Sequence, residues 1–135
     1  MSNASQPRLL RARAFIDRHY DQPIDLAQIG AQAGFSRYHF LRLFRTAFRE
    51  TPHQYLMRRR IERARALLAA SDLSITEICF AVGFQSLGSF STLFHRSAGC
   101  SPRAYRARHA GQHAHALARI PACFLTMYGV EASAD

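Results

Sequence analysis

The sequence predicts an all-α protein built from two similar halves. Apolar residues recur at helical spacing through the first 108 residues, and Ser, Thr or Asp residues suited to capping a helix precede most of these runs. The same pattern also occurs twice, because the Gly-Phe pair at residues 34–35 returns at residues 83–84. Two copies are too few for a solenoid, which needs about three repeats. The duplication therefore indicates two copies of one small module.

The repeat extends through most of each half. Beyond the Gly-Phe pairs, three pairs of residues lie 50 positions apart: Phe44 and Phe94, Pro52 and Pro102, and Tyr55 and Tyr105. One inserted residue between Phe84 and Phe90 explains why the Gly-Phe pairs lie 49 positions apart. Because the repeated phenylalanines are spaced along one face of a helix, we expect them to form the core of each half.

The first predicted helix has Pro7 in its first turn and ends near Tyr20, before an Asp-Gln-Pro sequence. Proline suits the first turn of a helix because the first backbone N–H groups have no partner within the helix. Asp25 then suits an N-cap position. The short helix after it ends at Gly34, which can adopt the left-handed conformation common at helix ends.

Ser36 is the next N-cap candidate, and the apolar stripe after it predicts a helix over residues 37–48. A short helix, a glycine turn and a second helix form a helix-turn-helix motif. Thr51 followed by Pro52 is a strong start signal, and the central helix that it opens extends to Ala70.

The second half repeats this order. Ser74 and Glu77 have the spacing of a capping box, and the short helix after them ends at Val82, ahead of the second Gly-Phe pair. A helix over residues 86–97 and another over residues 101–109 complete the domain. The elements together predict two helix-turn-helix subdomains, each a homeodomain-like three-helix unit, joined by a long central helix.

These elements divide the chain into five segments: 1–7, a disordered N-terminus or a remnant of cloning; 8–50, the first helix-turn-helix subdomain; 51–70, the linker helix; 71–110, the second helix-turn-helix subdomain; and 111–135, a C-terminal tail of unknown role. The tail is rich in Ala and His. Its one apolar stretch, residues 122–128, predicts a short docked helix or strand, or a segment that remains partly disordered.

The charge of the chain points to a polyanionic partner. All 18 basic side chains are arginines and only nine residues are acidic, which gives a net charge of +9. Nucleic acid is the simplest partner for such an excess, and an anionic membrane surface is the rival. There is no signal-peptide pattern and no apolar run long enough to span a bilayer.

Reactive residues are few. Cys79, Cys100 and Cys123 form no CxxC pair, which fits a reducing cytoplasm, although a redox switch through Cys100 or Cys123 stays open. His109, together with His113 and His115, has metal-like spacing at the start of the tail, but we expect no metal site there. There is no nucleophile–base pair, phosphate-cradling glycine loop or pair of carboxylates for acid–base work. The sequence therefore predicts neither an enzyme nor a cofactor.

Several motifs at specific spacings stand out: Gly34-Phe35-Ser36, Leu43-Phe44-Arg45, Thr51-Pro52-His53-Gln54-Tyr55-Leu56, Val82-Gly83-Phe84 and Ser101-Pro102-x-x-Tyr105-Arg106. With them, residues 8–108 resemble the AraC/XylS family of bacterial transcription regulators. Arg49 departs from the family pattern, in which glycine is common just before the Thr-Pro cap, and this departure bears on the local turn.

The resemblance implies a sequence-specific regulator of double-stranded promoter DNA that inserts two recognition helices into successive major grooves. It further implies an activator that contacts RNA polymerase, binds DNA as a monomer and works in the bacterial cytoplasm at the nucleoid, not at a membrane. Two alternatives stay open: a non-specific architectural DNA-binding protein, and the excised DNA-binding domain of a larger effector-responsive regulator.

By position, the resemblance gives the first recognition surface six residues: Ser36, Arg37, Tyr38, His39, Arg42 and Arg45. Arg42 is the expected base reader, because a guanidinium can bind guanine through two hydrogen bonds. Tyr38 can stack on a sugar or touch a thymine methyl group, whereas Ser36 and Arg37 are expected to hold phosphates. Leu41 stands where family members often have a polar reader, so its contact with DNA would be apolar.

The second recognition surface has seven expected residues: Ser86, Leu87, Gly88, Ser89, Ser91, Thr92 and Arg96. No long polar base reader precedes Arg96. Leu87 and Thr92 can touch thymine methyl groups, and Ser86, Ser89 and Arg96 can hold phosphates. We therefore predict that the first unit supplies most of the direct sequence readout and that the second unit mostly anchors the protein.

Overall fold

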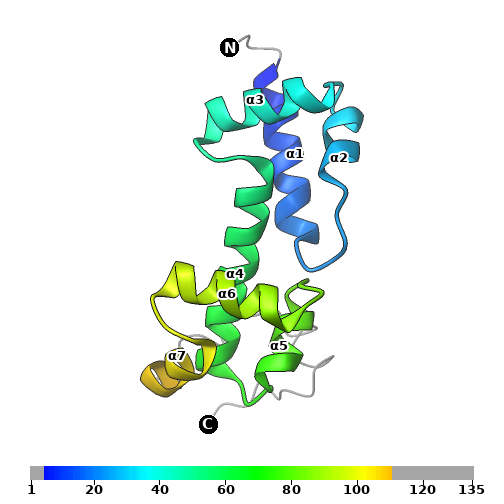
Figure 1. The fold of residues 1–135 in the computed structure, drawn as a ribbon. Coiled ribbons are helices and arrows are strands. Elements are labelled where there is room, and N and C mark those ends of the chain that lie inside the picture. The colour runs from blue at the N-terminus through cyan, green and yellow to red at the C-terminus, as the bar shows by residue number, and fades with distance from the viewer. Residues whose placement is uncertain (1–4, 111–135) are drawn as a thin grey trace. The chain divides into compact units, whose positions relative to one another are not determined.

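A computed structural model describes residues 5–110 as seven α-helices and, within that range, no strand (Figure 1). The helices are α1 (Ser5–His19), α2 (Leu26–Gln32), α3 (Arg37–Phe48), α4 (Pro52–Ala70), α5 (Ile75–Ala81), α6 (Leu87–Ala98) and α7 (Pro102–His109). The all-α prediction is confirmed. The predicted tail after residue 110, with its apolar stretch, lies outside the described residues.

The chain forms two compact units, of which unit 1 ends at Arg59 and unit 2 begins at Arg60. The boundary falls inside α4, so about two turns of this helix belong to unit 1 and the remaining turns belong to unit 2. The predicted linker helix is thus shared between the two units.

Unit 1 packs α1, α2, α3 and the start of α4 around an aromatic core (Figure 1). The side chain of Phe44 is fully buried at its centre, as is Leu9 on α1. Edge-on ring contacts surround Phe44, with centroid distances of 5.7 Å to Phe40, 4.6 Å to Phe48 and 5.9 Å to Tyr55. Such aromatic pairs add packing energy to the burial of apolar surface, so α3 is held on one side by its phenylalanines.

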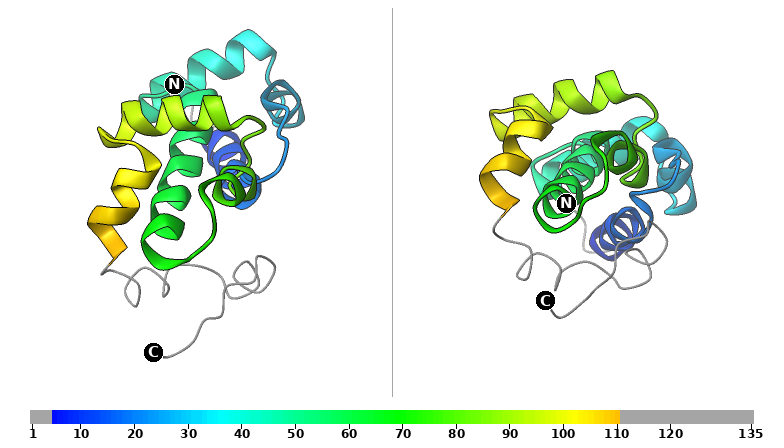
Figure 2. Two further views of the ribbon diagram at one scale, coloured as in Figure 1. Left: turned by 60° about the horizontal axis from the view of Figure 1, so that its bottom comes forward. Right: turned by 90° about the horizontal axis from the view of Figure 1, so that it is seen from below.

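Unit 2 repeats this arrangement, with α5, α6 and α7 around the C-terminal part of α4 (Figure 2). Phe94 is fully buried, and its ring lies 5.8 Å from Phe90 and 5.5 Å from Tyr105. All six repeated phenylalanines of the two units are at most 7% exposed. Their prediction as core residues is confirmed.

Side-chain caps start the helices where the sequence predicts them. In each cap a side-chain oxygen accepts a hydrogen bond of 3.0 to 3.2 Å from the backbone N–H three residues later: Asp25, Ser36, Thr51, Ser74, Ser86 and Ser101. The predicted capping box of Ser74 and Glu77 is complete. Thr51 and Gln54 form a second reciprocal pair that was not predicted. In it, the Gln54 side chain accepts a hydrogen bond from the Thr51 N–H at 2.9 Å.

Helix α1 begins at Ser5, so Pro7 lies in its first turn, as predicted. Pro7 is the third residue of α1. Proline is tolerated there because the first four N–H groups of a helix have no intrahelical acceptor, so the missing donor removes no hydrogen bond.

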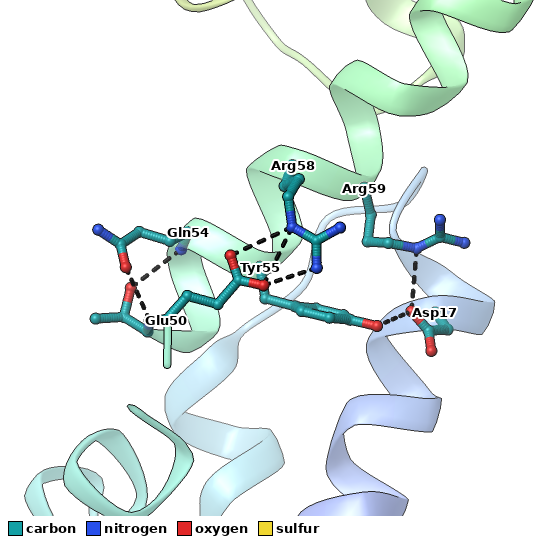
Figure 3. Close-up of polar contacts among 7 residues, drawn as sticks. Asp17, Glu50, Gln54, Tyr55, Arg58 and Arg59 are labelled. Atoms are coloured by element: carbon teal, nitrogen blue, oxygen red, sulfur yellow. Dashed lines mark hydrogen bonds and ion pairs between the residues drawn. The ribbon is translucent and has the colours of Figure 1, made fainter. Parts of the chain in front are cut away.

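A polar cluster joins α1 to α4 within unit 1 (Figure 3). The Tyr55 hydroxyl donates to Asp17 Oδ1 at 2.5 Å, and Arg59 Nε donates to the same oxygen at 3.1 Å. Burial, and then the hydrogen bond to Asp17, raise the pKa of Tyr55 to about 12. Beside this cluster, Arg58 pairs with Glu50 at 2.7 Å. Two arginines of α4 are therefore engaged by carboxylates of their own unit.

Candidate nucleic-acid interface

The glycine turn places the start of α3 on the surface of unit 1. Gly34 has a φ of +88°, which confirms that the chain turns there through the left-handed region. Ser36 then caps α3 by accepting a hydrogen bond from the His39 N–H at 3.2 Å. Phe40 and Phe44 bury one side of the helix, so the opposite side faces solvent.

All six residues predicted for the first recognition surface are exposed: Ser36, Arg37, Tyr38, His39, Arg42 and Arg45. The Tyr38 side chain is 71% exposed. The guanidinium carbon of Arg42 lies 5.8 Å from the centre of the Tyr38 ring, within the range of a cation–π contact. This contact holds Arg42 on the same face as Tyr38, one helical turn further along.

Of the seven residues predicted for the second recognition surface, at the N-cap and along α6, only Ser91 is half-buried. The other six are exposed: Ser86, Leu87, Gly88, Ser89, Thr92 and Arg96. Ser86 accepts from the Ser89 N–H at 3.0 Å and donates its hydroxyl proton to Ser89 Oγ at 3.1 Å. Arg96 lies in the last turn of the helix. The first two turns of α6 thus present small or apolar side chains to solvent.

Two residues outside the predicted set support the turns. Arg8 on α1 donates from Nη1 to the Ala33 carbonyl at 3.3 Å, and its guanidinium lies 4.5 Å from the centre of the Phe35 ring. In unit 2 the buried Cys79 thiol donates to the Ser86 carbonyl at 3.5 Å, and burial raises the pKa of this thiol. Arg8 lies 25 positions from Ala33, so no local motif could have revealed the contact.

Carboxylates are absent from the stretch of chain that holds each recognition helix. No acidic residue occurs between Asp25 and Glu50, or from residue 78 to residue 110, and each of these stretches carries four arginines. The local potential of both segments is therefore more positive than the net charge of the chain alone indicates. This signal is visible in the sequence, although the total charge alone does not reveal it.

An open groove borders the exposed side of each recognition helix, with a volume of about 820 Å³ in unit 1 and about 640 Å³ in unit 2. The linings include equivalent residues of the repeat, 50 positions apart: Arg37, Leu41 and Pro52 in unit 1, and Leu87, Ser91 and Pro102 in unit 2. Beside the recognition helix, the first groove has the Arg37 guanidinium where the second has Leu87, whereas the guanidinium that lines the second groove, Arg103, comes from α7.

Other site types find little support among residues 5–110. No group of three His, Cys, Asp or Glu residues in this range could hold a metal ion. His109 belongs to the range, whereas His113, His115 and Cys123 lie outside the described residues. No helix of the same range is both long enough and apolar enough to cross a bilayer.

Comparisons with known proteins agree with this geometry. A helix-turn-helix domain family matches residues 29–108. The regulatory protein SoxS of Escherichia coli K12 is 33% identical over 95 residues, which cover 70% of this chain and 89% of SoxS. The transcriptional activator RhaS of Klebsiella pneumoniae is 38% identical over 99 residues, which cover 73% of this chain and only 36% of RhaS.

Solved structures show the same fold. The DNA-binding domain of AdpA, a global transcriptional factor solved in complex with a target DNA, matches with a TM-score of 0.73 and 34% identity. The match covers 77% of this chain and 94% of that domain. The fold is therefore that of the DNA-binding domains of transcription regulators, and not that of an enzyme.

Proposed function

We infer that this chain, which belongs to the AraC/XylS family of helix-turn-helix transcription regulators, binds specific sequences in double-stranded promoter DNA. One observation carries this proposal: each unit presents an exposed recognition helix, α3 or α6, in a segment that has arginines and no carboxylates. The major groove of B-DNA is about 12 Å wide and admits one α-helix. This role requires no cofactor.

In this proposal, α3 and α6 enter successive major grooves of one duplex. Because each unit of the chain supplies its own recognition helix, a monomer makes both contacts without dimerisation. The AdpA domain, which shares the fold, was solved on its target DNA, and this supports double-stranded DNA as the ligand.

The two recognition helices contribute unequally to base recognition in this proposal. Arg42 has the geometry to donate two hydrogen bonds to guanine, and Tyr38 lies beside it on the same face. Ser36 and Arg37, at the start of α3, hold phosphates in this proposal. On α6 the one guanidinium lies in the last turn, at Arg96, so this helix contributes mainly contacts with the DNA backbone.

We further propose that the protein activates transcription through contact with RNA polymerase, at the nucleoid in the bacterial cytoplasm. RhaS, an activator, shares 38% of the aligned residues with this chain. Since the match covers only 36% of RhaS, the chain is also compatible with the role of a DNA-binding domain of a longer regulator. A non-specific architectural binder is the rival that specificity measurements test.

Replacing one reader on each helix tests the proposal. With a duplex that the full chain selects from a random pool, Arg42→Ala should weaken binding about 5- to 150-fold in gel shifts, because a bidentate contact with guanine is worth about 1–3 kcal/mol. Thr92→Ala, the equivalent position of the repeat, should weaken binding less than about threefold, because it removes one small contact.

The same gel shifts include an unrelated duplex as competitor. If it competes as well as the selected duplex, the protein is an architectural binder and not a specific regulator. Equal losses for Arg42→Ala and Thr92→Ala would contradict the unequal division between α3 and α6.

A further inference from the structure

Exposed apolar side chains gather on the recognition helices. Five large apolar side chains are exposed within residues 5–110, and three of them lie on α3 or α6, which hold less than a quarter of these residues: Tyr38 and Leu41 on α3, and Leu87 on α6. Single exposed apolar residues are ordinary on protein surfaces. Here, however, three such side chains lie on the two equivalent helices that are proposed to meet DNA. Their position indicates that the DNA surface in contact with these helices includes apolar groups.

Leu87 is the clearest case. It is the first residue of α6, is 41% exposed and lines the groove of unit 2 together with Ser91 and Thr92. The chain has no charged residue from position 78 to position 94. A base edge that meets the first two turns of α6 therefore meets an isobutyl group, a threonine methyl group and serine hydroxyls.

The chemistry of the major groove restricts what such a surface can read. The base edges there present hydrogen-bond donors and acceptors, and the 5-methyl group of thymine is their one apolar group. Covering a donor or acceptor with a leucine removes its water without replacing the hydrogen bond, which is unfavourable. Contact between Leu87 and a methyl group instead removes apolar surface from water.

We propose that Leu87, with Thr92 beside it, reads the 5-methyl groups of pyrimidines, so that thymine or 5-methylcytosine is preferred over cytosine in the half of the site that α6 contacts. This inference rests on the proposed function and adds the class of base that the second unit recognises. Leu41 lines the equivalent groove in unit 1 and adds a methyl contact beside the guanine reader Arg42.

Substitution of single methyl groups in the DNA tests the proposal. Each thymine of the duplex that the full chain selects from a random pool is replaced in turn by uracil, which removes only the 5-methyl group, and the Kd is measured by fluorescence anisotropy at fixed salt. At a thymine in contact with Leu87, the Kd should rise about two- to fourfold, as expected for one partly or fully buried methyl group. The protein should bind a duplex with 5-methylcytosine at that position more tightly than a duplex with cytosine there, by a similar factor.

In Leu87→Ala, uracil at that position should no longer raise the Kd, whereas the rise in Kd caused by uracil at other positions should be unchanged. Leu10→Ala is the matched control, because Leu10 is 42% exposed but lies on α1. In this variant uracil should raise the Kd at the same positions, and by the same factors, as in the parent protein. If the pool yields an enriched site but Leu87→Ala abolishes the effect of uracil at none of its thymines, the inference is overturned and the proposed function stays intact. A pool without any enriched sequence would overturn both.

Discussion

Arg49 holds a backbone conformation that unit 2 gives to a glycine. Its φ is +63°, and Gly99, at the equivalent position of the repeat, has a φ of +80°. Both residues end a recognition helix by donating the backbone N–H to the carbonyl four residues earlier, at 2.8 Å. A left-handed conformation costs a residue with a Cβ atom about 1 kcal/mol or more. The departure from the family pattern is therefore a strained residue in a turn that still forms.

Arg49→Gly should relieve this strain and raise the free energy of unfolding by about 1 kcal/mol. Arg49 is exposed, so the substitution removes no buried contact. Urea unfolding followed by circular dichroism measures the change. Arg45→Gly is the control, because the same replacement inside α3 should lower the free energy of unfolding by about 1 kcal/mol. A loss of stability in Arg49→Gly would show that the left-handed residue carries no strain.

At the scale of elements, the two units differ in how the first helix of the motif meets the recognition helix. In unit 1 the buried Gly30 lets the Phe40 ring approach the backbone of α2 so closely that an added Cβ atom would lie 2.6 Å from Phe40 Cδ2. The equivalent residue of unit 2 is Cys79, whose thiol bonds to the Ser86 carbonyl. Glycine in one unit and cysteine in the other therefore set the contact between the paired helices.

Gly30→Ala should lower the free energy of unfolding by about 1–2 kcal/mol, because the overpacking of a wedged ring outweighs the better helix propensity of alanine. The thermal unfolding midpoint should fall accordingly. Gly88→Ala, on α6, provides the comparison. A Cβ atom added there would have Ser86 Oγ as its nearest neighbour, at 3.9 Å, so this variant should gain stability. Equal gains in both variants would mean that Gly30 is not needed for the packing of α2 against α3.

At the scale of the whole molecule, the helices could be predicted because their signals are local. A cap such as Ser36 or Ser74 bonds to a backbone group three residues away, so its role is visible in a short stretch of sequence. The repeat then groups the helices into two modules, because equivalent residues such as Phe44 and Phe94 occupy equivalent places in two cores. Pro7 likewise marks the first turn of α1 through a local effect, because its missing N–H would have no partner there.

The candidate site could be predicted in part for the same reason. Once Phe40 and Phe90 point inward, the exposed face of each recognition helix follows from helical geometry, and only Ser91 of the predicted residues is partly covered. Contacts between distant positions could not be predicted. The Arg8 support of the first turn and the bond between Tyr55 and Asp17, which are 38 positions apart, depend on tertiary packing and have no local pattern.

In the proposed mode of binding, one chain recognises DNA through two units of unequal specificity. Selection of bound duplexes from a random pool by the full chain, followed by sequencing, tests it most directly. We expect one asymmetric site, with guanine among the most strongly specified positions of one half and a weaker preference for thymine in the other half. A palindromic site, or a pool in which no sequence is enriched, would contradict it.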